Sequence, residues 1–255
     1  MKYTNIIDTF TWSYSRLQAF ENCPYGFLLK YIFKADKEDK FFAQYGSFVH
    51  KILEKYHNGE LDKSQLVSYY LSQFYTSVTS NAPSPKIFTK YFKDGLNYFQ
   101  NITPSTDTVM GVEQEVSFTI EDRDFTGFID KVSQNDNHLI ITDNKSRILK
   151  HRSRRSKPTK SDEELDSYLR QLYLYSIPIH NQYGKYPDKL CFNCFRTQEI
   201  ITEEFNKESL EKTKQWALET INRISQEDEW SPNLDWFKCK YICDCSNECE
   251  YFKLL

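Results

Sequence analysis

Residues 125–145 read FTGFIDKVSQNDNHLIITDNK and predict a pair of β-strands. Two short runs of β-type residues, Phe125–Val132 and His138–Lys145, lie on either side of the polar pair Asp136-Asn137. A two-residue hairpin loop at this pair would join the runs as neighbouring antiparallel strands. Because the loop sets the register of a hairpin, the residues that face each other across it can be predicted.

This register brings three charged side chains together. It places Asp130 opposite Asp143, and because side chains alternate along a strand, Lys145 shares the face of Asp143. Two close carboxylates repel each other unless a cation lies between them. A divalent cation beside a lysine can promote hydrolysis of a phosphodiester bond, so Asp130, Asp143 and Lys145 are the candidate catalytic residues.

The composition fits one globular domain that spans 1–255. A hydrophobic share of 39% and an aromatic share of 16% can support a packed core. The net charge of −3 is not that of a generally basic nucleic-acid coat protein. We expect a helical part at 12–100, a sheet core at 108–200, and a C-terminal helix with a cysteine-rich tail at 205–255.

Neither a membrane span nor a secretory leader is expected. No run is long and apolar enough to cross a bilayer, and the first residues, MKYTNIIDTFTWSYSR, lack a signal-peptide pattern. The expected location is therefore cytoplasmic. Because disulfides are rare there, the seven cysteines do not predict disulfide bonds.

Hydrophobic periodicity predicts helices on both sides of the strands. The first helix is expected to break at Cys23-Pro24, and the tail, Trp230–Leu255, is expected to be irregular. The expected helices are Trp12–Phe33, Phe41–Tyr56, Ser64–Ser77, Ile87–Gln100, Asp162–Ile179 and Phe205–Gln226, and the expected strands are Val112–Ile120, Phe125–Val132, His138–Lys145 and Lys189–Arg196. This order predicts a mixed α/β fold with a central sheet flanked by helices.

Several short motifs follow one another in a recognisable order. They are Ser13-Tyr14-Ser15-Arg16-Leu17 with Cys23-Pro24, Gly46-Ser47-Phe48-Val49-His50, Glu113, Gly127-Phe128-Ile129-Asp130, Asp143-Asn144-Lys145, and Gln171-Leu172-Tyr173-Leu174-Tyr175. Over nearly the whole chain they resemble the PD-(D/E)XK nuclease superfamily in its RecB-like branch. Such relatives include nuclease domains of bacterial helicase–nucleases and the iron–sulfur exonucleases associated with CRISPR systems. The resemblance implies a restriction-endonuclease-like core, with an N-terminal helical part and a cysteine-rich C-terminal tail.

The resemblance also implies roles for individual residues. Asp130, Asp143 and the Asn144 carbonyl would bind magnesium or manganese, and His50 would add a nitrogen ligand. Lys145 would orient the attacking water or stabilise developing negative charge. Each of these groups is of a type that the metal-dependent cleavage of a phosphodiester requires.

Further residues surround this set. Glu113 is a candidate additional acid, and alternation would allow Glu115 to face the same side. Gln171 and Tyr175 lie four residues apart on one helix face and would orient Lys145 or contact the DNA backbone. For Tyr175, membership of an apolar helical stripe is an equally good explanation.

Two positions depart from the pattern of the relatives. They usually have an apolar or aromatic residue where this chain has Asn144, and often an arginine where it has Lys131. Alternation points the Asn144 side chain to the other side of the sheet. Neither change removes a group that the chemistry needs.

A basic run begins at Lys145. Residues 145–160 read KSRILKHRSRRSKPTK and contain no acid. Such runs are commonly solvated loops, but beside a site that cleaves phosphodiesters a phosphate-contacting loop is equally plausible. The candidate contacts to a DNA backbone are Arg147, Lys150, Arg152, Arg154 and Arg155.

The cysteines near the two ends of the chain suggest a cluster. The resemblance implies that one early and three late cysteines hold a 4Fe–4S cluster, and Cys23, Cys239, Cys243 and Cys249 fit this scheme best. Cys245 is spare and could replace Cys239. Such a clip would close a very long loop, where the closure entropy is largest.

A zinc site made from Cys191, Cys194 and two tail cysteines is the less favoured alternative. The two residues lie three apart in an expected strand, so alternation points them to opposite faces. Small apolar residues in a buried strand are the simpler explanation.

We therefore expect a metal-dependent DNA nuclease, an exonuclease on single strands or duplex ends, whose iron–sulfur cluster is structural. A helicase or recombination protein is the expected partner, in phage recombination, replication, CRISPR adaptation or DNA repair. The alternative is a catalytically inactive protein with the nuclease fold that binds nucleic acid or assembles a recombination or repair complex. RNA stays open as a substrate, because the core chemistry does not sense the 2′-hydroxyl.

Overall fold

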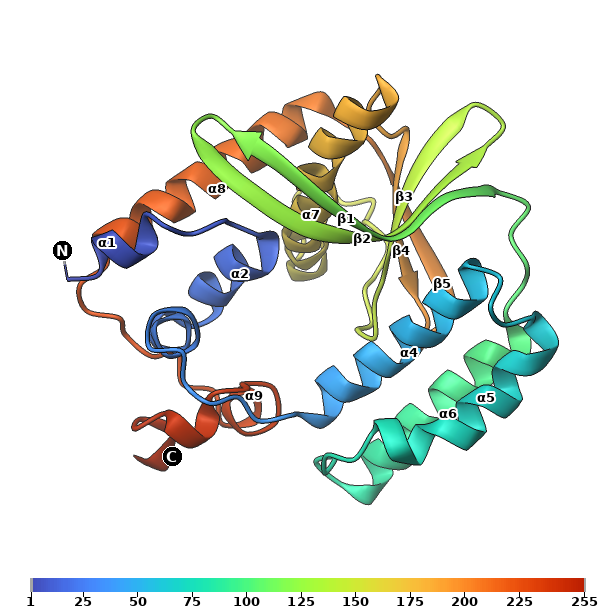
Figure 1. The fold of residues 1–255 in the computed structure, drawn as a ribbon, viewed down its shortest axis with the longest axis horizontal. Helices are drawn as coiled ribbons and strands as arrows, with labels where there is room; N and C mark the ends of the chain where they lie inside the picture. The colour runs from blue at the N-terminus through green and yellow to red at the C-terminus, as the bar shows by residue number, and fades with distance from the viewer. Residues whose placement is uncertain (1, 255) are drawn as a thin grey trace.

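The structure, a computed structural model that describes residues 2–254, has a five-stranded mixed sheet at its centre (Figure 1). The strands lie in the order β1-β2-β3-β4-β5. β1, β2 and β3 form an antiparallel meander, β3 and β4 are parallel, and β4 and β5 are antiparallel. The strands are β1 Thr108–Ile120, β2 Arg123–Asn135, β3 His138–Asn144, β4 Lys189–Cys194 and β5 Glu199–Glu204.

The hairpin of β2 and β3 has the predicted register. Lys131 pairs with Thr142, and Asp136 in the loop has a φ of 52°. Asp and Asn tolerate this left-handed conformation better than most residues, so they can close a tight turn. One residue further along the same register, Asp130 comes opposite Asp143.

Helices flank the sheet and extend the fold beyond it (Figure 1). α7 connects β3 to β4, and a helical crossover of this kind allows two neighbouring strands to be parallel. Within the described residues, none of the helices is long and apolar enough to cross a membrane. The helices are α1 Thr4–Ile7, α2 Tyr14–Asn22, α3 Pro24–Phe27, the π-helix η1 Leu28–Ile32, α4 Phe41–His57, α5 Lys63–Ser77, α6 Pro85–Asn101, α7 Lys160–Tyr183, α8 Lys207–Gln226, α9 Trp236–Tyr241, and the 3-10 helices η2 Ser246–Glu248 and η3 Phe252–Leu254.

The expected first helix is divided where the sequence predicts a break. Cys23 has an extended backbone, with φ −164° and ψ 103°, and it both ends α2 and begins α3. Its sulfur accepts the Gly26 N–H, and Pro24 occupies the first position of α3, where a proline costs nothing. The break therefore lets Cys23 Sγ cap the first turn of α3 through the Gly26 N–H.

Two expectations at the C-terminal side are wrong. The fourth strand ends at Cys194 rather than at Arg196, because the chain turns where the Thr197 N–H donates to the Cys194 carbonyl. The tail is not irregular throughout, because the Asp235 side chain accepts the Lys238 N–H and starts α9. The short elements α1 and β5 lie outside the expected ones, since neither shows a clear apolar period.

Two hydrophobic clusters hold the helices to the sheet. The larger cluster joins the sheet to α2, α7 and α8, and the smaller one joins α4, α5 and α6, which lie together at the lower right of Figure 1. Phe195, directly after β4, is fully buried in the smaller cluster and so connects it to the sheet. Burying an aromatic ring of this size contributes about 1.5–3 kcal/mol.

Arg196 makes a second connection between α6 and the sheet. Its guanidinium forms two short contacts with the Asp94 carboxylate, at 3.0 Å and 2.9 Å, and stacks over the Tyr91 ring. The Arg196 side chain is only 7% exposed. It also donates to the Ser146 carbonyl at 3.3 Å, directly after Lys145. Arg196 therefore links the helical part to the start of the basic run.

We expect Arg196→Ala to lower the free energy of unfolding by about 2–3 kcal/mol, because it breaks a largely buried ion-pair network and leaves Asp94 with the exposed Lys90 as its partner. Arg152→Ala is the matched control, since Arg152 is also paired with two carboxylates but is 39% exposed. There the expected loss is no more than about 1 kcal/mol. Urea denaturation measures both values, and equal losses in the two variants would contradict the assigned role of Arg196.

Candidate active site

A cleft of about 880 Å³ opens between α4, the sheet, α7 and the start of α2. Its walls carry most of the motif residues that the sequence analysis singled out. They include Ser13, Ser15, Gly46, His50, Glu113, Gly127, Phe128, Asp130, Asp143, Asn144, Lys145, Arg147, Gln171 and Tyr175. Motifs that are far apart in the chain thus meet around one hollow.

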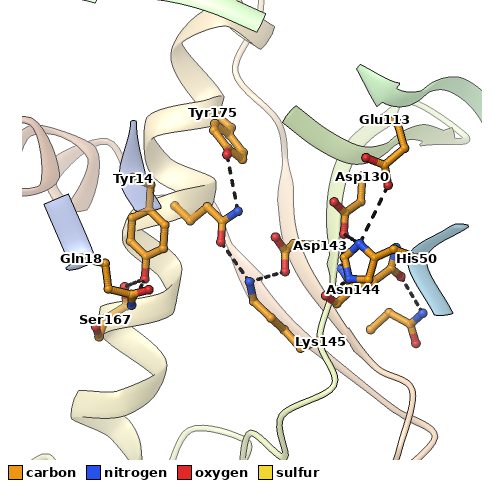
Figure 2. A network of polar contacts seen from close by, with 12 residues as sticks. Tyr14, Gln18, His50, Glu113, Asp130, Asp143, Asn144, Lys145, Ser167 and Tyr175 are labelled. Atoms are coloured by element: carbon orange, nitrogen blue, oxygen red, sulfur yellow. Dashed lines mark hydrogen bonds and ion pairs between the residues drawn. The ribbon is translucent and has the colours of Figure 1, made fainter. Parts of the chain in front are cut away.

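Three side chains in this cleft are arranged as a divalent cation would need them (Figure 2). His50 Nδ1 lies 3.4 Å from Asp130 Oδ2 and 3.9 Å from Glu113 Oε1. The ligand atoms of the three residues all lie within 4.8 Å of one another. A nitrogen and two carboxylates at this spacing could hold a divalent cation.

Glu113 reaches this group through an unusual backbone. Its φ is 45°, which is rare for a residue other than glycine. Val112 pairs with Lys131 and Gln114 pairs with Ile129, so Glu113 lies opposite Asp130 at a local distortion of β1. Backbone strain of this kind costs on the order of 1–3 kcal/mol and is concentrated at functional sites.

Glu115, the alternative acid, lies on the same strand but is exposed and does not line the cleft. The structure therefore brings Glu113, and not Glu115, to His50 and Asp130.

The main chain of Asn144 orients both His50 and Asp130. Its N–H donates to Asp130 Oδ2 at 2.6 Å, and its carbonyl lies 2.8 Å from His50 Nε2. A proton on Nε2 would bond this carbonyl and leave Nδ1 for the acids or a cation. The Asn144 side chain points to the other side of the sheet, as alternation predicts, and there it accepts a hydrogen bond from Asn193 at 2.8 Å.

Asp143 begins a second chain of polar contacts, towards α7 (Figure 2). Its Oδ2 lies 2.6 Å from Lys145 Nζ, and that ammonium group donates to Gln171 Oε1 at 2.9 Å. Gln171 in turn lies 3.5 Å from the Tyr175 hydroxyl. The predicted pair on α7 thus does lie beside Lys145, and it fixes the ammonium group next to Asp143.

The charges in this site perturb one another. Burial raises the pKa of Asp130, and the negative charges of Asp143 and Glu113 raise it further. Burial alone would lower the pKa of His50, but the bond to Glu113 and the charges of Asp130 and Asp143 outweigh it and raise that pKa. Without a cation, the site therefore retains protons at neutral pH. Protons held by crowded acids are what a bound cation replaces.

Gly127 lets α7 approach β2 closely. A Cβ at this position would clash with the Tyr175 ring. No larger residue fits this position without a shift of Tyr175. The glycine of the Gly-Phe-Ile-Asp motif thus allows the helix that carries Gln171 to lie against the sheet.

Comparison with known proteins places this arrangement in a family. The family model of the PD-(D/E)XK nuclease superfamily matches residues 11–250. The chain belongs to this superfamily. A solved structure from Eubacterium rectale, provisionally described as an exonuclease, is similar over 96% of this chain and 90% of its own, with 13% identity and a TM-score of 0.50. That likeness concerns the fold, and no curated protein matches the chain.

The sheet is the restriction-endonuclease-like sheet of this superfamily. Only part of the basic run, residues 145–160, lies at the cleft. Arg147 lines the cleft and is paired with Glu164 at 2.6 Å. Arg152 is paired with Asp166 and Glu203 outside the cleft lining. The remaining candidates for phosphate contact, Lys150, Arg154 and Arg155, are exposed and also lie outside the cleft lining.

In this PD-(D/E)XK chain the tail folds back onto the early helices, close to α3 (Figure 1). Lys30 Nζ donates to Asp244 at 2.6 Å, and the Tyr25 and Tyr251 rings lie 4.7 Å apart. The Asn233 N–H donates to Cys23 Sγ at 3.4 Å. These contacts bring the early cysteine to the late ones.

Four thiols influence one another electrostatically. Burial raises the pKa of Cys243 and of Cys249, and in each case Cys23 and Cys239 raise it further. Cys245 differs, because it is 1% exposed and its sulfur donates to the Asp244 carboxylate. Cys23, Cys239, Cys243 and Cys249 thus lie near enough to influence one another, and Cys245 lies near Cys243 with its sulfur turned to Asp244.

Cys191 and Cys194 behave as buried strand residues of β4. Cys194 is fully buried in the larger cluster, and Cys191 Sγ lies 3.4 Å from the Thr202 hydroxyl on β5. Burial raises the pKa of both thiols. Cys194 lies among apolar side chains and Cys191 faces Thr202, so both fit the simpler explanation of small residues in a buried strand.

Two residues support the site in ways that the sequence alone does not reveal. Arg196 follows β4 without any motif, and its contacts to Asp94 and Ser146 depend on how α6 packs. Gly127 belongs to a motif, but its contact with Tyr175 depends on how α7 packs. Only the spatial arrangement of elements that are distant in the chain makes these roles visible.

We expect Mn²⁺ to bind more tightly as the pH rises, because His50 and Asp130 must give up protons to it. Isothermal titration calorimetry in two buffers with different heats of protonation measures both the affinity and the protons released. Glu113→Gln should weaken binding by at least about tenfold. Glu115→Gln, an exposed acid on the same strand, is the control and should bind as the wild type does. Proton uptake, or equal losses in both variants, would exclude this site.

Proposed function

We propose that this chain is a metal-dependent deoxyribonuclease, an exonuclease that acts on single-stranded DNA or duplex ends. One observation carries the proposal, namely that His50, Glu113 and Asp130 meet in the same cleft as the ion pair of Asp143 and Lys145. Membership of the PD-(D/E)XK superfamily supports nucleic acid as the substrate. The structurally similar protein that is provisionally described as an exonuclease supports action at ends.

The residues divide into a metal-binding group and a water-orienting group. A divalent cation, magnesium or manganese, would supply Lewis acidity and acidify a water molecule. His50, Glu113 and Asp130 would hold it, with Asp143 and the Asn144 carbonyl completing the set. Lys145 would orient the attacking water and neutralise charge on the phosphate, while Gln171 keeps the ammonium group in position.

A non-catalytic binding or assembly protein is the alternative. It would need the fold but neither Lys145 nor the crowded acids. Asp143 is only 4% exposed, and a buried carboxylate costs stability. A protein that only binds or assembles would gain nothing in return for that cost. The whole catalytic set therefore favours the enzyme.

Cleavage of a labelled single strand in Mg²⁺ or Mn²⁺ tests the proposal. We expect Asp143→Asn and Lys145→Met each to reduce cleavage by at least about 100-fold, the effect of losing a preorganised charged group. Lys185→Met, outside the cleft lining, is the matched control and should cleave normally. Binding without cleavage in either metal would favour the assembly protein, and cleavage of RNA alone would change the substrate.

We also propose that Cys23, Cys239, Cys243 and Cys249 hold a structural 4Fe–4S cluster. Two observations support this proposal. The four thiols lie near enough to influence one another electrostatically. Cys23 Sγ accepts the N–H groups of Gly26 and Asn233, and such donors stabilise thiolates. The cluster would join the two ends of the chain and restrict the unfolded state. Zinc in the same four thiolates is the alternative.

Anaerobically purified protein should therefore be brown, with about four irons per chain. Cys249→Ser should lose colour and iron, because it removes one of the four proposed ligands. Cys245→Ser is the control, because that thiol is turned to Asp244, and it should keep both. Colourless protein that contains zinc would replace the cluster with a zinc site, and loss of colour in Cys245→Ser alone would move the ligand assignment.

A further inference from the structure

The cations that line the cleft already have carboxylate partners. Lys51 Nζ lies 3.0 Å from Glu54, and Arg147 lies 2.6 Å from Glu164. Lys145 is held by Asp143 at 2.6 Å. Proteins bind a duplex backbone tightly when their cationic side chains neutralise many phosphates. Among the described lining residues, the cleft thus offers little free positive charge for binding a duplex backbone in this way.

The aromatic rings of the cleft differ in how much of their surface is free. Phe42 packs on Tyr91 and Phe237, with ring centres 5.2 Å and 6.0 Å away. Tyr168 lies against the charged groups of Lys145 and Arg147. Tyr175 packs on Gly127. Phe42, Tyr168 and Tyr175 therefore already pack against other groups of the protein.

Phe128 is the exception. Its side chain lines the cleft and is 53% exposed. It lies two residues before Asp130 on β2, so both side chains leave the strand on the same face. No ring–ring or cation–ring contact involves Phe128 within residues 2–254.

The backbone that carries this free ring is held firmly. The preceding Gly127 packs closely against the Tyr175 ring. Phe128 also pairs with Glu115 in the sheet. A flat apolar surface is thus presented beside the metal-binding group at little further cost in backbone entropy.

We propose that Phe128 stacks on a nucleobase of a single-stranded substrate, next to the phosphate that is cleaved. This proposal rests on the nuclease function proposed above. Bases in a duplex are covered by their neighbours, whereas an unpaired base offers its face to an aromatic ring. Stacking compensates for the missing phosphate contacts, so the cleft favours an unpaired strand over a continuous duplex.

Fluorescence of a 2-aminopurine placed within a single-stranded oligonucleotide tests the proposal. Binding is measured with Mn²⁺ in the Lys145→Met background, so that the strand is not consumed. Phe128→Ala should abolish quenching of the probe and weaken binding by about tenfold, and Phe128→Trp should restore both. Phe33→Ala removes a ring that is 52% exposed outside the cleft lining, and it should change neither.

A strand with abasic positions supplies a second arm. Proteins with and without Phe128 should bind that strand equally, because no base is left to stack. Unchanged binding of the normal strand by Phe128→Ala, or an equal loss on the abasic strand or on a duplex, would overturn the proposal. Mn²⁺ titration of Phe128→Ala checks that the metal site is intact.

The two levels of the proposal fail separately. If the unsubstituted protein cleaves nothing in either metal, the nuclease function fails, while quenching of the probe still decides whether Phe128 stacks. If the unsubstituted protein cleaves and Phe128→Ala cleaves single strands equally well, the nuclease stands and the stacking role of Phe128 is lost.

Discussion

Repulsion between three carboxylates is the constraint on which the rest of the structure depends. Glu113, Asp130 and Asp143 come from neighbouring positions on β1, β2 and β3, and burial denies them full hydration. Such a group is stable only if protons or cations compensate its charge. The pKa of Asp130 is raised accordingly, so this carboxyl binds a proton more readily than a free aspartate does.

The helical parts supply compensation from two sides. α4 brings His50 to Glu113 and Asp130, while Lys145, steadied by Gln171 on α7, neutralises Asp143. Both contacts need helices that are placed to within about 0.5 Å. The close approach at Gly127 places α7, and the pair of Arg196 with Asp94 ties α6, which shares a hydrophobic cluster with α4, to the end of β4. Helix packing therefore sets the electrostatics of the cleft.

Local rules explain why part of this site is predictable from sequence. The hairpin loop at Asp136 fixes the register, and alternation then fixes which side chains share a face with Asp143. The left-handed backbone that selects Glu113 over Glu115 breaks alternation, so no period could reveal it. The free ring of Phe128 and the role of Arg196 depend on contacts between distant elements, which a single sequence does not contain. The family resemblance supplied the cysteine assignment, where spacing alone left Cys239 and Cys245 interchangeable.

The balance of charge in the cleft connects the metal with the substrate. Without a cation, the two lysines and the one arginine that line the cleft are all paired with carboxylates, so the described lining residues offer little free positive charge to attract a phosphate. His50, Glu113 and Asp130 would hold the divalent cation of the proposed function, and its charge would supply the attraction for phosphate that the paired side chains lack. Under the two proposals, substrate recognition would be divided between an ion that attracts phosphate without reading sequence and the Phe128 ring, which would accept any unpaired base. Such a division would give the tolerance of sequence that the proposed degradation of strands from their ends requires.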